Sequence, residues 1–289
     1  MSVTVTPADA VLGAEIEGVT AGPAMTEREL LHIRDALLRH SVVVVRGQDL
    51  TPDDQIAFMD RLYGIHPPFS PTVPPFAVPG KPQIQIVSNI VEDGKNIGIS
   101  DAGLLWHSDT SSFPTPELFV SLFALEIPLR DGVALGDTLW TGAIAAYEAL
   151  PDAIKAELAG RRVSQSFAFH IEKMRAHRIL TRGKEAQTTP NISHLHPVVR
   201  THPITGRKLL YVNESYSEWI EGLAPERSQQ LLEELWAHLR QPRFLFRHRW
   251  CKGDFVIWDN CATQHLATFD YGSIPRRLHR CGSDGPVPA

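Results

Sequence analysis

The sequence has little cysteine and no long apolar stretch. Its cysteines, Cys251, Cys261 and Cys281, include no CxxC pair, which argues against a disulfide framework or a cysteine-rich zinc site and favours a reducing compartment. No window approaches the ~18 apolar residues that a membrane span needs, and no basic segment followed by an apolar one marks a signal peptide. We therefore expect a cytoplasmic protein without a membrane partner.

Runs of positive charge and several common catalytic motifs are also missing. The 289 residues carry 28 Lys and Arg against 33 Asp and Glu, a net charge of −5, which argues against a nucleic-acid partner. The motifs GxGxxG, GxxxxGK[ST], GxSxG and HExxH and the EF-hand loop do not occur. These absences exclude most nucleotide-binding, α/β-hydrolase and zincin enzymes. We expect a small-molecule partner and a homo-oligomer.

Helix signals are clearest near the N-terminus. Thr26 and Glu29 form a capping box ahead of an apolar pattern with helical spacing, and Thr51 followed by Pro52 predicts a second helix start. The expected helices span about residues 27–40, 52–62, 142–158 and 225–239.

Short runs rich in β-branched and aromatic residues predict many strands. They lie at residues 42–45, 83–87, 118–126, 137–140, 196–200, 208–212, 244–250, 255–258 and 277–281. Seven prolines predict an irregular loop at Pro67–Pro82, and a polar interval at 170–193 predicts a lid or insert. With no linker to divide it, the chain is expected to be one mainly β domain over residues 1–289, a sandwich or barrel braced by helices.

Histidines and carboxylates carry the strongest chemical signal. In an extended segment His107 and Asp109 would point to the same face, which brings an imidazole and a carboxylate together. His265, after an apolar strand, offers a third ligand. Two histidines and one carboxylate leave adjacent metal positions open, as in non-haem Fe(II) oxygenases. His194 and His196 are competing candidates without a nearby carboxylate.

Arginines near the C-terminal end suit a dicarboxylate. Arg276 and Arg280 are an even number of residues apart in a strand-like stretch, so both could face the interior. A guanidinium binds a carboxylate with two parallel hydrogen bonds, which lysine cannot reproduce. The alternative is a solvated arginine patch on the last strand.

Five sequence blocks together resemble the TauD/TfdA family of Fe(II)- and 2-oxoglutarate-dependent dioxygenases, in the family's order and over almost the whole chain. They are residues 106–109, 136–150, 196–203, 258–265 and 276–280. The resemblance implies a double-stranded β-helix, or jelly roll, with flanking helices. It also implies a reaction in which 2-oxoglutarate and O2 give succinate and CO2 while a substrate carbon is hydroxylated, with cleavage following where the hydroxylated product is unstable.

The resemblance also implies residue roles. His107, Asp109 and His265 correspond to iron ligands, and Thr138 and Arg276 to residues that hold the distal carboxylate of 2-oxoglutarate. Residues in substrate-binding positions are His66, Tyr216 and Arg280, the last for an anionic group.

One departure from the taurine enzyme bears on the substrate. Leu104 and Leu105 stand where that enzyme has polar residues, which favours a larger anion with an apolar body: a sulfonate, a sulfate ester or an aryloxyalkanoate. The alternatives are a carboxylate natural product or amino-acid-derived substrate, a catalytically inactive binding protein on the same fold, and a zinc hydrolase that uses the same three ligands.

Overall fold

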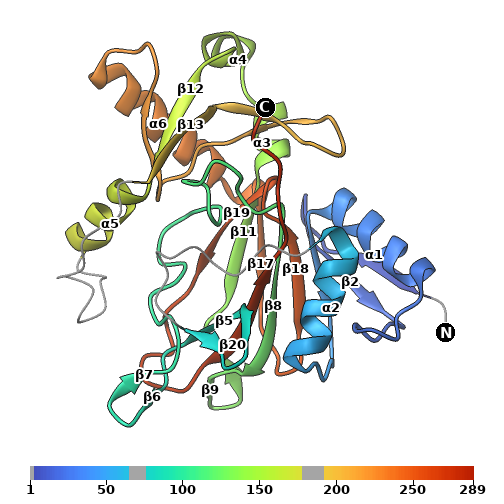
Figure 1. Cartoon of the computed structure of the whole chain (residues 1–289). Coiled ribbons are helices and arrows are strands. Elements are labelled where there is room, and N and C mark those ends of the chain that lie inside the picture. The colour runs from blue at the N-terminus through green and yellow to red at the C-terminus, as the bar shows by residue number, and fades with distance from the viewer. Residues whose placement is uncertain (1–2, 65–75, 178–191) are drawn as a thin grey trace.

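The computed structural model describes residues 3–64, 76–177 and 192–289, and its frame is a sandwich of two β-sheets (Figure 1). The larger sheet has eight strands in the order β1-β2-β3-β18-β8-β20-β5-β4, and the smaller one has the order β17-β11-β19. Among the strand pairs of these two sheets in the described part of the chain, β2 with β3 is the parallel one. The strands of the larger sheet are β1 (Thr4–Pro7), β2 (Ala14–Glu17), β3 (Val42–Val45), β4 (Ala77–Val78), β5 (Lys81–Ser88), β8 (Phe119–Glu126), β18 (Phe255–Asp259) and β20 (Arg277–Gly282); those of the smaller are β11 (Thr138–Gly142), β17 (Leu245–His248) and β19 (Thr263–Ala267).

The valine run of β3 shows why the strands of the larger sheet form. Successive side chains of a strand point to opposite faces. Val42 and Val44 belong to the apolar cluster between the sheets, with Trp140 of the smaller sheet, whereas Val43 and Val45 belong to the cluster that includes the buried faces of two helices. Burial on both faces explains why this strand is apolar throughout rather than alternating.

Those helices are α1 (Glu27–His40) and α2 (Pro52–Tyr63), which cover the outer face of the larger sheet (Figure 1). Both begin at a complete capping box: Thr26 and Glu29 cap α1, and Thr51 and Asp54 cap α2. Each pair satisfies two backbone N–H groups that lack a partner within the helix. Both expected helices are confirmed.

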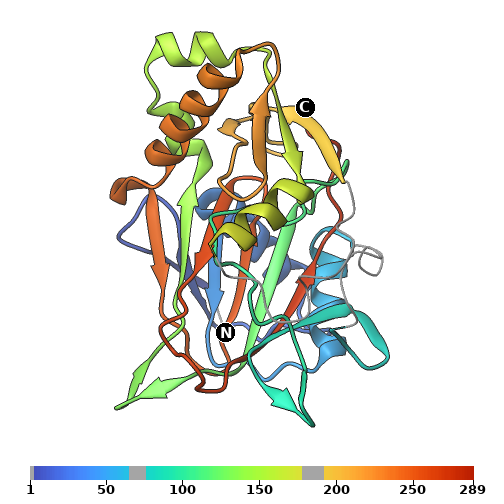
Figure 2. The same cartoon turned by 90° about the vertical axis from the view of Figure 1, so that its left-hand side faces the viewer.

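A third group of elements lies at one end of the sandwich, beside the strand ends, in both views (Figure 1, Figure 2). It contains the sheet β13-β12-β16 and the helices α4 and α6. Small hairpins lie at the opposite end. The remaining elements are β6 (Val91–Glu92), β7 (Lys95–Asn96), β9 (Leu129–Arg130), β10 (Val133–Ala134), β12 (Arg162–Ser166), β13 (Ser193–Pro197), β14 (Val199–Thr201), β15 (Lys208–Leu210), β16 (Ser217–Ile220), α3 (Ala143–Glu148), α4 (Asp152–Leu158), α5 (Phe167–Ala176), α6 (Pro225–Leu239) and a 3-10 turn at Pro242–Phe244.

The structure corrects several expected boundaries. The helical interval at 142–158 is two helices, because Pro151 cannot donate the backbone hydrogen bond that a continuous helix needs. The expected strand at 196–200 is two strands separated at Val198, whose N–H donates to Arg161 O instead. The loop expected to reach Pro82 already forms β4 and the start of β5 at its C-terminal end.

The expected lid also changes. Its first residues belong to α5, whose start Ser166 caps through its hydroxyl group, and residues 178–191 lie outside the described part of the chain. The sequence did not predict β1, β2, β12, β16 or β19, nor the two-residue strands β4, β6, β7, β9 and β10. Among the described residues no helix combines the length and the apolar character that a membrane crossing requires.

Candidate metal centre and active site

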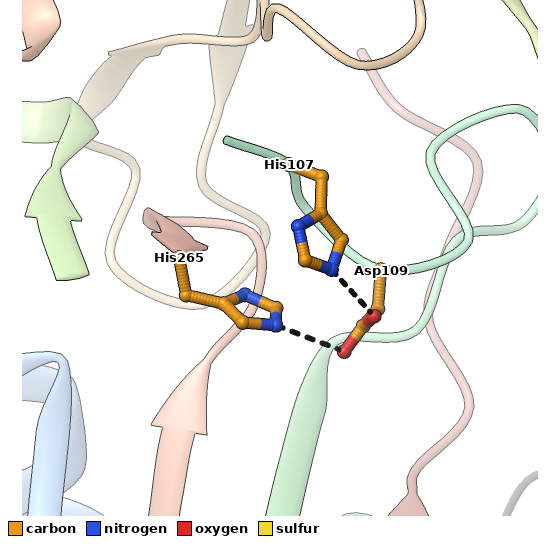
Figure 3. Close-up of side chains that lie close together, drawn as sticks. All are labelled: His107, Asp109 and His265. Carbon is orange, nitrogen blue, oxygen red and sulfur yellow. Dashed lines mark ion pairs between the residues drawn. The ribbon is translucent and has the colours of Figure 1, made fainter. Parts of the chain in front are cut away.

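The side chains of His107, Asp109 and His265 lie close together and point toward one another (Figure 3). Their ligand atoms all lie within 4.8 Å of one another. His265 is on β19, opposite Trp140 of β11, while His107 and Asp109 lie on the loop before β8. The loop is not the extended strand that the sequence suggested; only His107 is locally extended, in a single bridge with His265. That bridge brings the histidine and the carboxylate of one loop to the histidine of a distant strand.

The hydrogen bond of His107 fixes its tautomer. Its Nδ1 lies 2.8 Å from the carbonyl oxygen of Leu105, which can only accept, so Nδ1 carries the proton. In the neutral ring, Nε2 then keeps its lone pair, and it lies 3.4 Å from Asp109 Oδ1. In that form of the ring a cation could bind to both Nε2 and the carboxylate.

The other two ligands have the protonation states that a metal requires. Burial lowers the pKa of His265 to about 3, with the neighbouring His107 as a further cause, so the ring is neutral near pH 7. Burial alone would raise the pKa of Asp109, but Arg280 and the two histidines hold it well below its usual range. His265 Nε2 lies 3.8 Å from Asp109 Oδ2, and its Nδ1 has no hydrogen-bond partner among the described residues. A neutral imidazole and an ionised carboxylate are both ready to coordinate.

Asn260 holds the ligand loop in place. Its Oδ1 accepts from the Asp109 N–H at 2.8 Å, and its Nδ2 donates to the carbonyl oxygens of Asp109 at 3.0 Å and Glu117 at 2.8 Å. Thr110, in the left-handed region with φ 54°, closes the same loop, because its hydroxyl group accepts from the Glu117 N–H at 2.8 Å. The sequence block around 258–265 contained Asn260, but its clamping role could not be inferred without the loop that it contacts.

Thr138 and Arg276 both lie near Gly136, which precedes β11. Thr138 opens β11 and its hydroxyl group accepts from Trp250 Nε1 at 3.0 Å. Arg276 is 4% exposed, donates from Nη2 to Gly136 O at 3.2 Å, and leaves its Nε without a partner in the described ranges. A Cβ on Gly136 would lie 2.9 Å from that Nε, so glycine gives the guanidinium its space. Burial lowers the pKa of Arg276, and the cost of burying this cation favours a carboxylate beside it.

Arg280 lies between two carboxylates. Its Nη2 is 3.0 Å from Asp109 Oδ2 and also contacts Glu117 Oε2, while its Nη1 is 3.3 Å from Glu117 Oε1. The side chain of Glu117 is fully buried. The sequence analysis missed Glu117, although an acidic residue directly before the buried strand β8 is itself a signal, since buried carboxylates are almost always paired.

The other expected substrate residues are spread around this centre. Tyr216 is half-buried and its ring stacks on His170 at 4.7 Å between centroids; burial raises its pKa, as does the nearby charge of Asp109. Leu105 is buried and Leu104 is half-buried. His66 lies outside the described residues.

A second buried cluster contains His202, Asp259 and Cys261. His202 Nδ1 accepts from the N–H groups of Ile204 and Thr205, so its Nε2 holds the proton and donates to Asp259 Oδ2 at 2.7 Å. Asp259 Oδ1 accepts from Ala262 N at 3.0 Å. No lone pair of the histidine is left for a metal.

The two competing histidines join neither cluster. His194 is exposed, and His196 Nε2 bonds to the carbonyl oxygen of Phe113 at 2.9 Å. Burial lowers the pKa of His196 to about 4.

Residues 4–281 match the model of the Taurine catabolism dioxygenase TauD, TfdA family. Pentalenolactone F synthase of Streptomyces arenae is 34% identical, covering 97% of this chain and 94% of its own. The alpha-ketoglutarate-dependent sulfate ester dioxygenase of Pseudomonas putida is 32% identical, with coverages of 100% and 91%. The alpha-ketoglutarate-dependent 2,4-dichlorophenoxyacetate dioxygenase of Cupriavidus pinatubonensis is also 32% identical, with both coverages 97%.

A solved taurine dioxygenase from Burkholderia xenovorans superimposes with a TM-score of 0.80 at 31% identity, covering 100% of this chain and 93% of its own. The chain belongs to the TauD/TfdA family, and its fold is the jelly roll of that family. It is an oxidoreductase that depends on Fe(II), 2-oxoglutarate and O2. The donor set of two imidazoles and one carboxylate fits Fe(II).

Proposed function

We propose that this dioxygenase hydroxylates a small organic anion, with His107, Asp109 and His265 as the iron ligands. The observation that carries the ligand assignment is the convergence of the three side chains, in which His107 Nδ1 bonds to Leu105 O and Nε2 is directed toward Asp109. When iron is bound, it supplies the oxidising chemistry with 2-oxoglutarate and O2. The chain contributes the buried donors and their orientation.

We infer that Thr138 and Arg276 bind the distal carboxylate of 2-oxoglutarate. Arg276 is a buried cation whose Nε has no partner among the described residues, and Thr138 offers a hydroxyl group two residues beyond the Gly136 carbonyl that Arg276 contacts. A carboxylate there would receive charge-assisted hydrogen bonds from a guanidinium already fixed in place. With Thr138 and Arg276 assigned to 2-oxoglutarate, the substrate would be bound by other side chains near the metal.

For the substrate we propose a sulfonate, a sulfate ester or an aryloxyalkanoate. Arg280 would meet the anionic group, with His66 beside it, while Tyr216, Leu104 and Leu105 would contact the apolar body. The relatives that act on sulfate esters and on 2,4-dichlorophenoxyacetate support this class. The similarity to an enzyme named pentalenolactone F synthase supports, in part, the second candidate, a natural-product substrate. Intact ligands disfavour an inactive binding protein.

The deciding experiment is a panel of anions scored by substrate-stimulated succinate formation with Fe(II), 2-oxoglutarate and O2, with product masses recorded. We expect alkyl sulfates, sulfonates or aryloxyalkanoates to stimulate turnover more than taurine. A gain of one oxygen atom marks hydroxylation, and release of sulfate or a phenol marks subsequent cleavage. Stimulation by neutral or cationic compounds alone would contradict the proposal.

We also infer one domain over residues 1–289 and a cytoplasmic location. The family match from residue 4 to residue 281 supports the first inference. Three free cysteines, one exposed and two buried, support a reducing compartment.

A further inference from the structure

Glu117 contacts the same guanidinium, that of Arg280, as the proposed metal ligand Asp109. The Glu117 carboxylate contacts both terminal nitrogens of the guanidinium, and Arg280 Nη2 lies 3.0 Å from Asp109 Oδ2. Arg280 belongs to β20, which pairs with β8 just after Glu117. One cation therefore lies between two anions, and the three side chains carry a formal charge of −1.

The fold is built around this carboxylate. Asn260 Nδ2 donates to the Glu117 carbonyl oxygen, and Thr110 Oγ1 accepts from its N–H, so the backbone is held on both sides. A Cβ on Gly282 would clash with Glu117 Oε1, so glycine leaves space for the carboxylate where it now lies. The backbone contacts and this space together favour the observed pairing.

The pairing changes what Arg280 offers to a substrate. A guanidinium beside one carboxylate has a net charge near zero, whereas here a second, fully buried carboxylate faces the same group. In a buried site charges interact more strongly than in water, so an arriving anion is repelled by Glu117 as well as attracted by Arg280. Each further negative charge on the substrate increases that repulsion.

We propose that Glu117 is a specificity-determining residue that restricts the substrate to singly charged anions. This inference rests on the proposed function, in which Arg280 meets the anionic group. Sulfonates, sulfate monoesters and carboxylates carry one negative charge near pH 7. Phosphate monoesters have nearly the same shape as sulfate monoesters but carry about −1.5 to −2 charges near pH 7. The site should therefore accept an alkyl sulfate and reject the alkyl phosphate of equal chain length.

The test compares wild type with Glu117→Gln, which keeps the size and one hydrogen-bond acceptor but removes the charge. The matched control is Glu148→Gln, the same change in the exposed ion pair with Arg207, whose Nη2 lies 2.7 Å from Glu148 Oε1. The measurements are KM for an alkyl sulfate and the matching alkyl phosphate, and calorimetric binding of both to the metal-free protein.

For Glu117→Gln we expect KM and the dissociation constant of the alkyl sulfate to fall by about tenfold, which corresponds to ~1.4 kcal/mol. KM for the alkyl phosphate should fall by more than about tenfold, so the ratio of phosphate KM to sulfate KM should also fall. The control Glu148→Gln should have the same values as wild type. Glu117→Asp, which keeps the charge but withdraws it from the guanidinium, should give intermediate values and covers the case in which Glu117→Gln does not fold.

Each outcome decides between the two hypotheses. If anions stimulate wild type but both Glu117 variants keep its sulfate-to-phosphate discrimination, the specificity inference is wrong and the proposed function stands. If anions stimulate only Glu117→Gln, the charge effect is supported and the anionic natural substrate is rejected. If no anion stimulates or binds to any variant, both are rejected.

Discussion

Two buried clusters of similar composition behave differently in this molecule. His107, Asp109 and His265 on one side, and His202, Asp259 and Cys261 on the other, each bring ligand atoms within 4.8 Å. In the second cluster every hydrogen-bonding atom of the imidazole is used by the protein itself. In the first, His265 Nδ1 and Asp109 Oδ2 have no hydrogen-bond partner among the described residues. Unused lone pairs, more than residue types, therefore distinguish a metal centre from a structural His–Asp pair.

The largest effect is expected from substitutions in the first cluster, that of His107, Asp109 and His265. His107→Ala, Asp109→Ala and His265→Ala should each lose iron and reduce succinate formation at least about a hundredfold, since even indirect supports of metal ligands are worth 10–100-fold. Metal content of the purified protein and Fe(II)-dependent turnover measure this. Full succinate production by any of the three variants would refute the ligand set.

A substitution in the second cluster, that of His202, Asp259 and Cys261, should instead lower the free energy of unfolding. His202→Leu leaves the Asp259 carboxylate buried without its donor, and breaking such a pair costs about 3 kcal/mol or more of unfolding free energy. Denaturant unfolding of the metal-free protein measures the loss, and iron content per folded molecule should not change. If the His202→Leu variant lost iron but kept its stability, the second cluster would be the metal centre and the comparison would be wrong.

Another buried histidine, His279, extends the comparison to pH dependence. Neither ring nitrogen of His279 has a partner among the described residues, and burial lowers its pKa to about 4. The unfolded chain takes up this proton below pH ~6.5 but the folded protein only near pH 4, so stability is complete above 6.5 and is lost as the pH falls. Compared with His279→Leu, wild type should lose about 2 kcal/mol more unfolding free energy between pH 7 and pH 5.

Unfolding curves of both metal-free proteins at the two pH values give that difference, in which the other titrating groups cancel. Equal pH dependence would show that His279 is protonated in the folded protein.

The smallest effect concerns the cosubstrate. Arg276→Lys keeps the charge but loses the planar fork, so the apparent affinity for 2-oxoglutarate should fall by about tenfold, or ~1.4 kcal/mol. KM for 2-oxoglutarate measures this loss. The control is Arg247→Lys, the same change in a half-exposed arginine that forms an ion pair with Asp137. An unchanged KM would move the cosubstrate away from Arg276.

Local signals in the sequence predicted the elements that local physics fixes. The capping box of Thr26 and Glu29 predicted the start of α1, Thr51 followed by Pro52 predicted that of α2, and the valine run predicted β3. The strand β19 escaped prediction because it is short and its sequence, Thr263 to Ala267, is polar where the active site needs polar groups. Its pairing with β11 comes from a distant segment, which no local pattern can show.

The grouping of His107, Asp109 and His265 was predicted because three residue types in a known order define the chemistry, and the structure brings all three together; their role as iron ligands remains a prediction. Asn260 and Glu117 escaped as functional residues because their roles are contacts between segments far apart in the chain. The roles of Thr138, Arg276, Arg280, Tyr216 and the two leucines remain predictions.

The backbone link between two ligands has a thermodynamic consequence. His107 and His265 exchange both hydrogen bonds, with the N–H of each donating to the carbonyl oxygen of the other, at 3.2 and 2.8 Å. Two of the three donors are thus already joined through the main chain before iron arrives. Binding then does not need to order them, and the conformational entropy of bringing these segments together is lost during folding rather than during metal uptake.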